Sequence, residues 1–370
     1  MSARRDVPLF FWNVLSTSLC TPKSYFEPHY DPVDLDPETR TAAVAARVEA
    51  EVSAGKLVAL VEVDTVKILP ALLPIFDRYN YGVMQQMYGR YYNGFMGVVL
   101  AWPREQYELV DCKQTQMGEL LYQKYRSRLP ARAVEPRFPW YMGGVLSDAV
   151  AAGWKQIFPA KPVKLPPNVW AESTRRQNWV LMARLSARSG NTDPFVVAAY
   201  HMPCMFFLPP AMLLHADAVM TEVCDFAGED PTIVAGDWNF GPASHPYQLI
   251  TGDVGPMAEP APFATGDGLR PAADSGPVEE AGPDGWKPTL TRRFESACVK
   301  AFGHEPASTN QAKMKDGKEF CGVLDFVFLS EGTNWRVAMD PVPGEEHMGR
   351  LAPNADLASD HVPLDMSLRF

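Results

Sequence analysis

An apolar stretch near the middle of the chain ends abruptly in polar residues. Residues 232–235 read Thr-Ile-Val-Ala and are followed by Gly236, Asp237, Trp238 and Asn239. Positions i and i+2 of a strand lie on one face, so Asp237 and Asn239 should point to one spot at the strand end. Burying a carboxylate is costly unless it is paired or holds a metal ion. The alternative is an ordinary turn, since Gly, Asp and Asn are common turn residues.

The same pattern recurs elsewhere in the chain, and this recurrence favours a site over a turn. Each further polar residue adjoins an apolar stretch: Asn13 follows 10–12, Glu62 follows 57–61, His201 follows 195–200, Asp325 lies within 322–329, and Asp360 and His361 precede the alternating residues 362–370. Open sheets place their ligands at strand ends. Six polar ends that converge therefore predict an active site.

The residue types in this set suit a hard cation and phosphorus chemistry. Carboxylates with amide oxygens are ligands that Mg²⁺ or Mn²⁺ accepts. Such an ion offsets charge on phosphoryl oxygens, a carboxylate can orient or deprotonate water, and a histidine can donate to a developing oxyanion. The sequence lacks the serine-hydrolase elbow, the glycine–lysine phosphate loop and the short His/Cys spacing of a zinc site. We therefore predict Mg²⁺-dependent hydrolysis of a phosphorus ester, with Mn²⁺ able to substitute.

Strands and helices must alternate along the chain to position these residues. Asp36-Pro37 and Gly55 are typical of the start and end of a helix between two strands. Residues 195–235 form a second strand–helix–strand unit, with Pro210 and Gly228 at the ends of its helix. We predict a single α/β domain, a four-layer α-β-β-α sandwich of two packed mixed sheets.

Three further segments complete this expected architecture. Residues 94–102 and 107–110 are predicted to form a hairpin. Two insertions are expected, a basic and aromatic one at about 113–175 and a Gly/Pro-rich acidic loop at about 252–288. The first could track phosphates and stack bases, or it is a solvated segment whose aromatic side chains pack inward. The second is either a flap beside the site or a tolerated surface loop.

Bulk properties narrow the classes of protein. The chain has 370 residues, 46% of them hydrophobic and 21% charged, as expected for a soluble globular enzyme. A formal net charge of −10 disfavours broad nonspecific binding to nucleic acid. No apolar run has the length of a membrane helix and no signal peptide is recognised, so we expect no membrane partner. The six cysteines show no paired spacing, so we expect a reducing compartment, the cytoplasm or the nucleus.

The order of the polar motifs resembles that of a known superfamily. The chain contains Trp-Asn-Val around Asn13, Val-Glu-Val-Asp from Val61, Tyr-His-Met around His201, Gly-Asp-Trp-Asn from Gly236, Leu-Asp-Phe-Val-Phe from Leu324 and Ser-Asp-His from Ser359. This series is similar to the endonuclease/exonuclease/phosphatase superfamily and spans nearly the whole chain. Segments 236–250, 309–325 and 351–364 resemble its deadenylase branch, which includes the carbon-catabolite-repression deadenylases, nocturnin, the angel proteins and the 2′,5′-phosphodiesterase. Trp238 stands where a phenylalanine is common in that branch.

The resemblance implies a role for each motif residue. Glu62 would be the chief magnesium ligand, with Asn13 and Asp360 nearby. Asp237 would activate or orient water and Asn239 would hold the phosphate, while His201 and His361 (oriented by Asp325) would contact phosphoryl oxygens. The general base stays open. Substrate contacts are expected from Asn13, Asn310, Phe320 and Pro209, with Phe320 as an adenine platform or a core residue and Pro209 as an apolar wall or simply a helix start.

The function implied by this resemblance is Mg²⁺-dependent 3′–5′ exoribonuclease activity on poly(A) tails, with single-stranded RNA as the partner. Three alternatives stay open: a phosphatase or phosphodiesterase on a small nucleotide or other phosphoester, an endonuclease acting on DNA or RNA through the same site, and a catalytically silent binding module. The sequence carries no leucine-rich repeats, so docking to an adaptor through such repeats is not expected.

Overall fold

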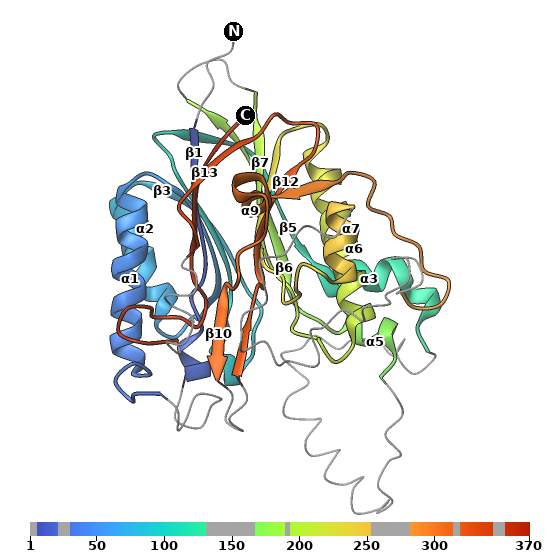
Figure 1. Cartoon of the computed structure of the whole chain (residues 1–370), viewed down its shortest axis with the longest axis horizontal. Helices are drawn as coiled ribbons and strands as arrows, with labels where there is room; N and C mark the ends of the chain where they lie inside the picture. The colour runs from blue at the N-terminus through green and yellow to red at the C-terminus, as the bar shows by residue number, and fades with distance from the viewer. Residues whose placement is uncertain are drawn as a thin grey trace, which may run out of the picture.

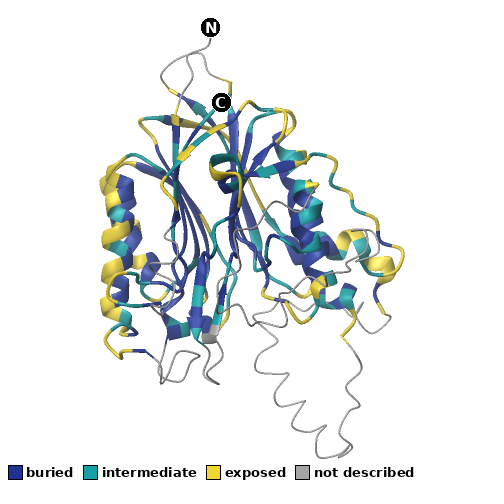
Figure 2. Cartoon of the chain, viewed as in Figure 1, coloured by how far each residue is buried: buried dark blue, intermediate teal, exposed yellow. Residues whose placement is uncertain are grey.

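Two six-stranded mixed sheets pack face to face, and helices cover their outer faces (Figure 1). This computed structural model describes residues 6–20, 30–130, 167–188, 193–252, 282–313, 319–342 and 352–370. The four-layer sandwich predicted from the sequence is confirmed. Three hydrophobic clusters fill it, one between the two sheets and one between each sheet and its helices. Figure 2 shows these inner faces as buried and the outward faces of the helices as exposed.

The first sheet has a parallel pair at its centre. Its strands are, in spatial order, β13 (Arg336–Met339), β14 (Leu364–Arg369), β1 (Asp6–Asn13), β2 (Leu57–Val63), β4 (Gly97–Pro103) and β3 (Tyr81–Met87). β1 and β2 are parallel and are joined through α1 (Pro37–Ser53). The carboxylate of Asp36 accepts the Thr39 N–H at 2.8 Å, so the predicted cap begins α1. α1 packs beside α2 (Ile68–Arg78), which the sequence did not predict.

The second sheet repeats this plan. Its strands are, in spatial order, β5 (Tyr107–Gln116), β6 (Trp179–Ala187), β7 (Phe195–His201), β8 (Thr232–Asp237), β12 (Asp325–Ser330) and β9 (Phe294–Ser296). β7 and β8 are parallel and are joined through α6 (Pro209–Ala227). The remaining helices within the described residues are α3 (Met117–Tyr125), α5 (Val169–Thr174), α7 (His245–Thr251) and α9 (Ala297–Phe302), with short 3₁₀ turns at Thr17–Cys20, Tyr91–Asn93 and Arg126–Arg128. A small two-stranded sheet pairs β10 (Asn310–Lys313) with β11 (Glu319–Gly322).

The hairpin predicted over residues 94–110 is wrong. β4 is paired on both sides, with β2 and with β3, so it has no free edge for β5. The turn at residues 104–106 instead carries the chain into the other sheet. On one side the Arg104 N–H donates to Asn80 O at 3.1 Å, and on the other the Arg188 N–H donates to Gln106 O at 2.9 Å.

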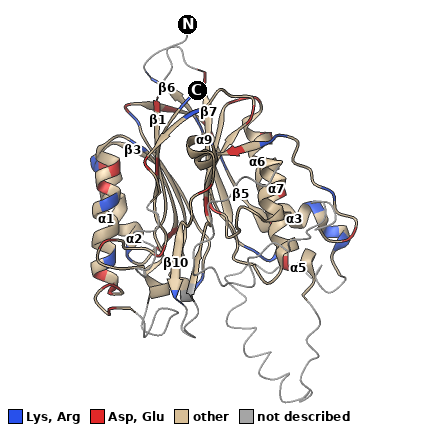
Figure 3. Ribbon diagram, viewed as in Figure 1, with Lys and Arg blue, Asp and Glu red and all other residues tan. Residues whose placement is uncertain are grey.

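The described ends of the basic segment belong to the second sheet and to the helices that cover it. Lys113 lies in β5 and pairs with Glu222, and Lys124 of α3 pairs with Asp217 at 3.6 Å. Arg175 and Arg176 both pair with Glu172. Figure 3 shows basic residues along α3 and the turn after it. Residues 131–166, and residues 253–281 of the second expected insertion, lie outside the described residues. None of the described helices is long and apolar enough to cross a membrane.

Candidate active site

The ends of the two parallel strand pairs bring the predicted residues together. Asn13 ends β1 and His201 ends β7, and His201 is in register with Asp237 at the end of β8. Asp325 begins the antiparallel strand β12, also opposite Asp237. Glu62 lies one residue before the end of β2. Each sheet therefore contributes polar residues to the same edge of the sandwich.

Asn13 connects the residues of the first sheet with those of the second. Its Nδ2 donates to Asp237 Oδ2 at 2.9 Å and to Glu62 Oε1 at 3.2 Å, and it lies 3.3 Å from His361 Nε2. Its Oδ1 accepts the Leu15 N–H at 3.0 Å. The amide nitrogen, rather than the oxygen, therefore faces the carboxylates, and metal ligation by Asn13 would require its amide to turn.

Glu62 reaches the site through a backbone irregularity. The β2–β4 register shifts between Val61 and Val63, and Glu62 has a φ of 59°. A bulge re-aims a side chain, and positive φ is uncommon for a residue other than glycine, so this conformation costs free energy that the surrounding structure must offset. The Ser16 N–H donates to Glu62 Oε2 at 3.2 Å. Asn239, the other site residue with positive φ (52°), donates its N–H to Asp237 Oδ1 at 2.9 Å and its Nδ2 to Met202 O at 2.8 Å.

His361 is held as a charged donor. Its Nδ1 lies 2.7 Å from Asp325 Oδ2, and its Nε2 lies 3.8 Å from Asp237 Oδ2. Burial lowers the pKa of His361, but the carboxylates of Asp325, Asp360 and Asp237 raise it well above the ordinary value. Thr309 Oγ1 accepts the N–H groups of Leu324 and Asp325, which fixes the start of β12. His361 is therefore an imidazolium whose Nε2 faces the other site residues.

His201 has an uncharged partner that the sequence did not reveal. Its Nδ1 lies 2.9 Å from the hydroxyl of Tyr88. Asn178 Nδ2 donates to the same hydroxyl at 3.5 Å and to His201 O at 2.7 Å. Because an amide nitrogen can only donate, the Tyr88 oxygen accepts from Asn178 and its own O–H is free to donate to Nδ1. In a neutral ring this places the proton on Nε2, which lies 3.5 Å from Asp237 Oδ2.

Asp237 lies at the centre of the cluster and is buried. Burial raises its pKa to about 6, while His361 and His201 oppose the rise and Asp325 adds to it. Asp237 is therefore largely ionised at neutral pH and can take up a proton under mildly acidic conditions.

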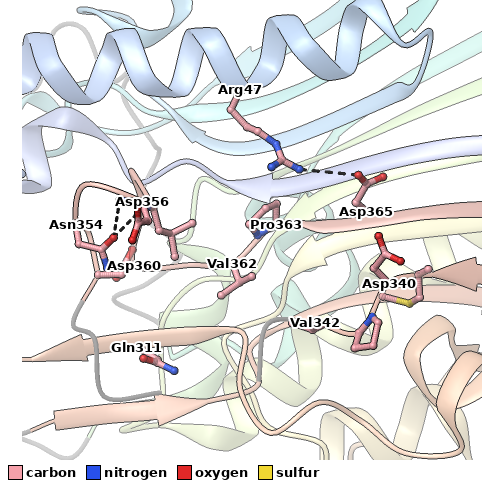
Figure 4. Close-up of a pocket in the computed structure, with 14 residues that line it drawn as sticks. Arg47, Gln311, Asp340, Val342, Asn354, Asp356, Asp360, Val362, Pro363 and Asp365 are labelled. Carbon is pink, nitrogen blue, oxygen red and sulfur yellow. Dashed lines mark hydrogen bonds and ion pairs between the residues drawn. The ribbon is translucent and has the colours of Figure 1, made fainter. Parts of the chain in front are cut away.

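Asp360 and the expected substrate residues lie around this cluster. Asp360 borders a cavity of about 340 Å³ whose walls also carry Asp340, Asp356 and Asp365 (Figure 4). Burial raises the pKa of Asp360, and its carboxylate accepts a hydrogen bond from Asn310. The metal-ligand role of Asp360 stays a prediction.

The remaining expected substrate residues are also placed by the fold. Asn310 forms a backbone bridge with His361. Phe320 is half-buried on β11, with its ring against Gly322. Pro209 is the exposed first residue of α6. His215, mid-helix in α6, is fully buried and bonds Tyr200 and Ser173, as expected for a core residue.

A buried arginine braces the loops that carry the site. Arg40 of α1 donates from Nη2 to Val14 O at 2.9 Å and to Leu15 O at 2.6 Å, and from Nε to Ala358 O at 2.8 Å. These carbonyls follow Asn13 and precede Asp360, so one side chain ties together two site-bearing segments. An arginine within an amphipathic helix pattern gives no sequence signal for this role.

The donor set fits a divalent cation. Ligand atoms of Glu62, His201 and Asp237 lie within 4.8 Å of one another, as do those of Asp237, Asp325 and His361. In the described part of the chain, neither Lys nor Arg forms an ion pair with Glu62, Asp237 or Asp325. The ion-pair partners of these carboxylates there are the two imidazoles. Clustered carboxylates without a basic partner are compensated by a bound cation. Glu62 and Asp237 would hold it.

Solved structures share this architecture. ANGEL2, a 2′,3′-cyclic phosphatase in complex with adenosine-2′,3′-vanadate, matches with a TM-score of 0.66 at 15% identity over 100% of this chain and 97% of that chain. The human Nocturnin catalytic domain with bound sulfate matches with a TM-score of 0.55 at 13% identity over 100% and 96%. An endonuclease/exonuclease/phosphatase from Bacteroides vulgatus matches with a TM-score of 0.53 at 14% identity over 98% of each chain.

No family model matches the chain, and no curated protein matches its sequence. The likeness therefore lies in the fold, and it extends over the full length of the chain. The chain has the fold of the endonuclease/exonuclease/phosphatase structures.

Proposed function

We propose that this chain is a divalent-metal-dependent phosphodiesterase that acts at the 3′ ends of RNA. The observation that carries this proposal is the convergence of Glu62, Asp237 and Asp325 with two oriented imidazoles at one edge of the sandwich. Three clustered carboxylates, two buried and one partly buried, have imidazoles as their only ion-pair partners among the described residues. Such a group suits a cation and a phosphoryl group better than it suits structural support. The match of fold to structures named as phosphatases and nucleases supports the same class.

The residues divide the hydrolysis of a phosphoester among them. A water molecule attacks phosphorus, the bond from phosphorus to the leaving oxygen breaks, and that oxygen acquires a proton. Asp237, largely ionised at neutral pH, orients the water and can accept its proton. His361 and the Nε2–H of His201 donate to the phosphoryl oxygens as negative charge develops. A bound Mg²⁺ would supply charge neutralisation at Glu62.

Shortening of an adenosine tail from its 3′ end is the first candidate activity. It rests on the deadenylase-like segments around Asp237, Asp325 and Asp360, and on the match to the Nocturnin fold. The products would be 5′-mononucleotides, released one at a time. Phe320 and Pro209 are the proposed adenine contacts.

Opening of a terminal 2′,3′-cyclic phosphate is the second candidate activity. The TM-score is higher for ANGEL2, named as a 2′,3′-cyclic phosphatase, than for Nocturnin. The two candidates use the same site and differ in the group that occupies it.

A substrate panel separates the two candidates. RNAs labelled at the 5′ end would carry an adenosine tail, a cytidine tail or a 2′,3′-cyclic phosphate, and each would be incubated with Mg²⁺ or Mn²⁺. A ladder descending by single nucleotides, faster for adenosine, supports the first candidate. Conversion of the cyclic end alone supports the second. If neither ion supports hydrolysis of any of these RNAs, or if only phosphate release from mononucleotides is seen, the proposal fails.

A further inference from the structure

Exposed aromatic side chains gather on the two loops that adjoin His201. Tyr91 (88% exposed) and Phe95 (42%) lie on the loop between β3 and β4, and Phe206 (46%) and Phe207 (60%) lie between β7 and α6. They are the four most exposed aromatic side chains among those that the structure describes. We call these four residues the aromatic rim.

Hydrogen bonds connect both loops to the candidate active site. Tyr88, at the start of the first loop, bonds His201, and the second loop begins directly after His201. In the second loop, Met202 N–H donates to Asp237 O at 2.8 Å, and Met202 O accepts from Asn239 Nδ2 at 2.8 Å. Phe206 and Phe207 follow Met202 by four and five residues. Five residues of chain span at most roughly 18 Å, so both rings lie within a few nucleotides of the phosphoryl site.

The exposure of these rings is built into the fold. Met202 and Met205 are fully buried and anchor the second loop to the core. The Leu208 N–H donates to Met205 O at 2.7 Å. The Phe206 and Phe207 rings meet edge to face, 6.1 Å apart at 84°. The loop is therefore pinned on both sides of the two phenylalanines, and their outward position is not a consequence of fraying.

Phe95 adds an independent indication. Its φ of 53° is unusual for a bulky residue, and its ring is exposed, so core packing does not explain the conformation. The preceding Gly94 is packed so closely that a Cβ there would lie 2.9 Å from the Asp64 Cβ. Strained backbone beside a site is commonly retained for ligand contact.

Resting on the proposed function, we propose that the aromatic rim stacks unpaired nucleobases next to the hydrolysed phosphoester. Exposed apolar surface at the mouth of a charged site marks ligand recognition. Bases offer flat faces for stacking only when they are unpaired, because a duplex hides those faces. The net charge of −10 limits general attraction to phosphates, so stacking can supply the affinity. The substrate class is therefore single-stranded nucleic acid rather than duplex or a small sugar phosphate.

The test compares a double variant, Phe206→Ala with Phe207→Ala, with the wild type and with Phe302→Ala. Phe302 is a matched control because it is a 36%-exposed phenylalanine at the end of α9, outside the rim. Binding of fluorescent single-stranded RNA is measured by anisotropy in EDTA, and turnover is measured with Mg²⁺. The double variant should raise Kd and KM roughly tenfold or more, with little change in kcat. Phe302→Ala should behave as the wild type does.

A second comparison uses RNA that lacks the bases at the positions flanking the cleaved phosphoester. Removal of those bases should weaken wild-type binding by a similar factor and should not weaken binding by the double variant further. Unchanged Kd in the double variant, or an equal loss in both proteins on base removal, overturns the stacking role and leaves the rim to a protein partner. If the wild type hydrolyses no RNA, the proposed function fails, while the anisotropy comparison still decides the stacking role.

Discussion

The two site histidines near Asp237 are held by different hydrogen-bond partners. Asp325 holds Nδ1 of His361, whereas the hydroxyl of Tyr88 holds Nδ1 of His201. A carboxylate favours the doubly protonated ring, and a hydroxyl that donates favours a ring with its proton on Nε2. The site therefore presents two imidazole Nε2–H donors to the phosphoryl group, and each ring is oriented by a different partner.

Replacement of Tyr88 tests this arrangement. Tyr88→Phe removes one hydroxyl, and the loss of an orienting partner should lower kcat by roughly tenfold or more while KM changes little. Tyr91→Phe, on the same loop but exposed, should have no such effect on kcat. Nitrogen NMR shifts of His201 should show the Nε2–H tautomer in the wild type and a mixture in Tyr88→Phe. If adding Tyr88→Phe to His201→Ala lowers kcat by a further factor of ten, Tyr88 acts through a group other than His201.

Asp237 and His361 are expected to act in the transition state. Asp237→Asn and His361→Ala should each lower kcat by roughly two to four orders of magnitude, the range for lost acid–base or oxyanion groups. KM should change far less. Steady-state kinetics on the adenosine-tailed RNA would measure both constants. A rise in KM alone would mean that these residues bind substrate in the ground state.

Some site residues carry a sequence signal and others do not. Asp237, Glu62 and His201 lie at or near the ends of apolar strands. Burying such polar groups costs free energy, and this cost indicated a site. Tyr88 and Asn178 lie in stretches where Tyr and Asn are ordinary loop residues, so their contacts depend on the tertiary fold. The one sequence feature that could have pointed to Tyr88 is the cluster of Tyr and Gly residues from Tyr88 to Gly94 after a strand.

At the scale of elements, strands that alternate with capped helices could be predicted, and irregular elements could not. α1 begins at the predicted Pro37, and α6 begins at Pro209, one residue before the predicted Pro210. α2 escaped prediction because Pro70 and Pro74 interrupt its apolar pattern, although Pro70 lies in its first turn, where a missing N–H is tolerated. The bulge at Glu62 and the crossing of residues 104–106 between sheets depend on pairing partners far along the chain, which local sequence does not encode.

The loop after α9 contains a buried carboxyl group with a testable effect on stability. Burial raises the pKa of Glu305 to about 7 despite a hydrogen bond from the Tyr247 hydroxyl. A raised folded-state pKa means that stability is present at low pH and is lost as pH rises through about 7. Glu305→Gln stays neutral, so it should unfold at higher urea than the wild type at pH 8, by roughly 2–3 kcal/mol.

The same comparison at lower pH supplies the control. The difference between Glu305→Gln and the wild type should shrink as pH falls toward 5, where Glu305 is protonated in the folded protein. Glu295→Gln, at an exposed site paired with Lys300, should show no comparable dependence on pH. A Glu305→Gln variant that is less stable than the wild type at pH 8 would contradict the assignment.

At the scale of the whole molecule, the site belongs to neither sheet alone. Asn13 and Glu62 come from the first sheet and His201, Asp237 and Asp325 from the second, and the core between the sheets holds the two sets at hydrogen-bond distance. The sandwich and its polar edge followed from strand patterning and motif order. The aromatic rim did not, because exposure is set by how each loop folds, the loop between β7 and α6 over the buried Met202 and Met205.

The most direct test of the account measures Mg²⁺-dependent cleavage of a 5′-labelled, adenosine-tailed RNA by the wild type and by Glu62→Gln. Thermal unfolding of both proteins confirms that the variant is folded. The account predicts cleavage by the wild type with Mg²⁺, none in EDTA, recovery with Mn²⁺, and a loss of at least roughly two orders of magnitude in Glu62→Gln at saturating Mg²⁺. Cleavage in EDTA, or a folded Glu62→Gln that retains the wild-type rate, would contradict a metal-dependent phosphodiesterase centred on Glu62.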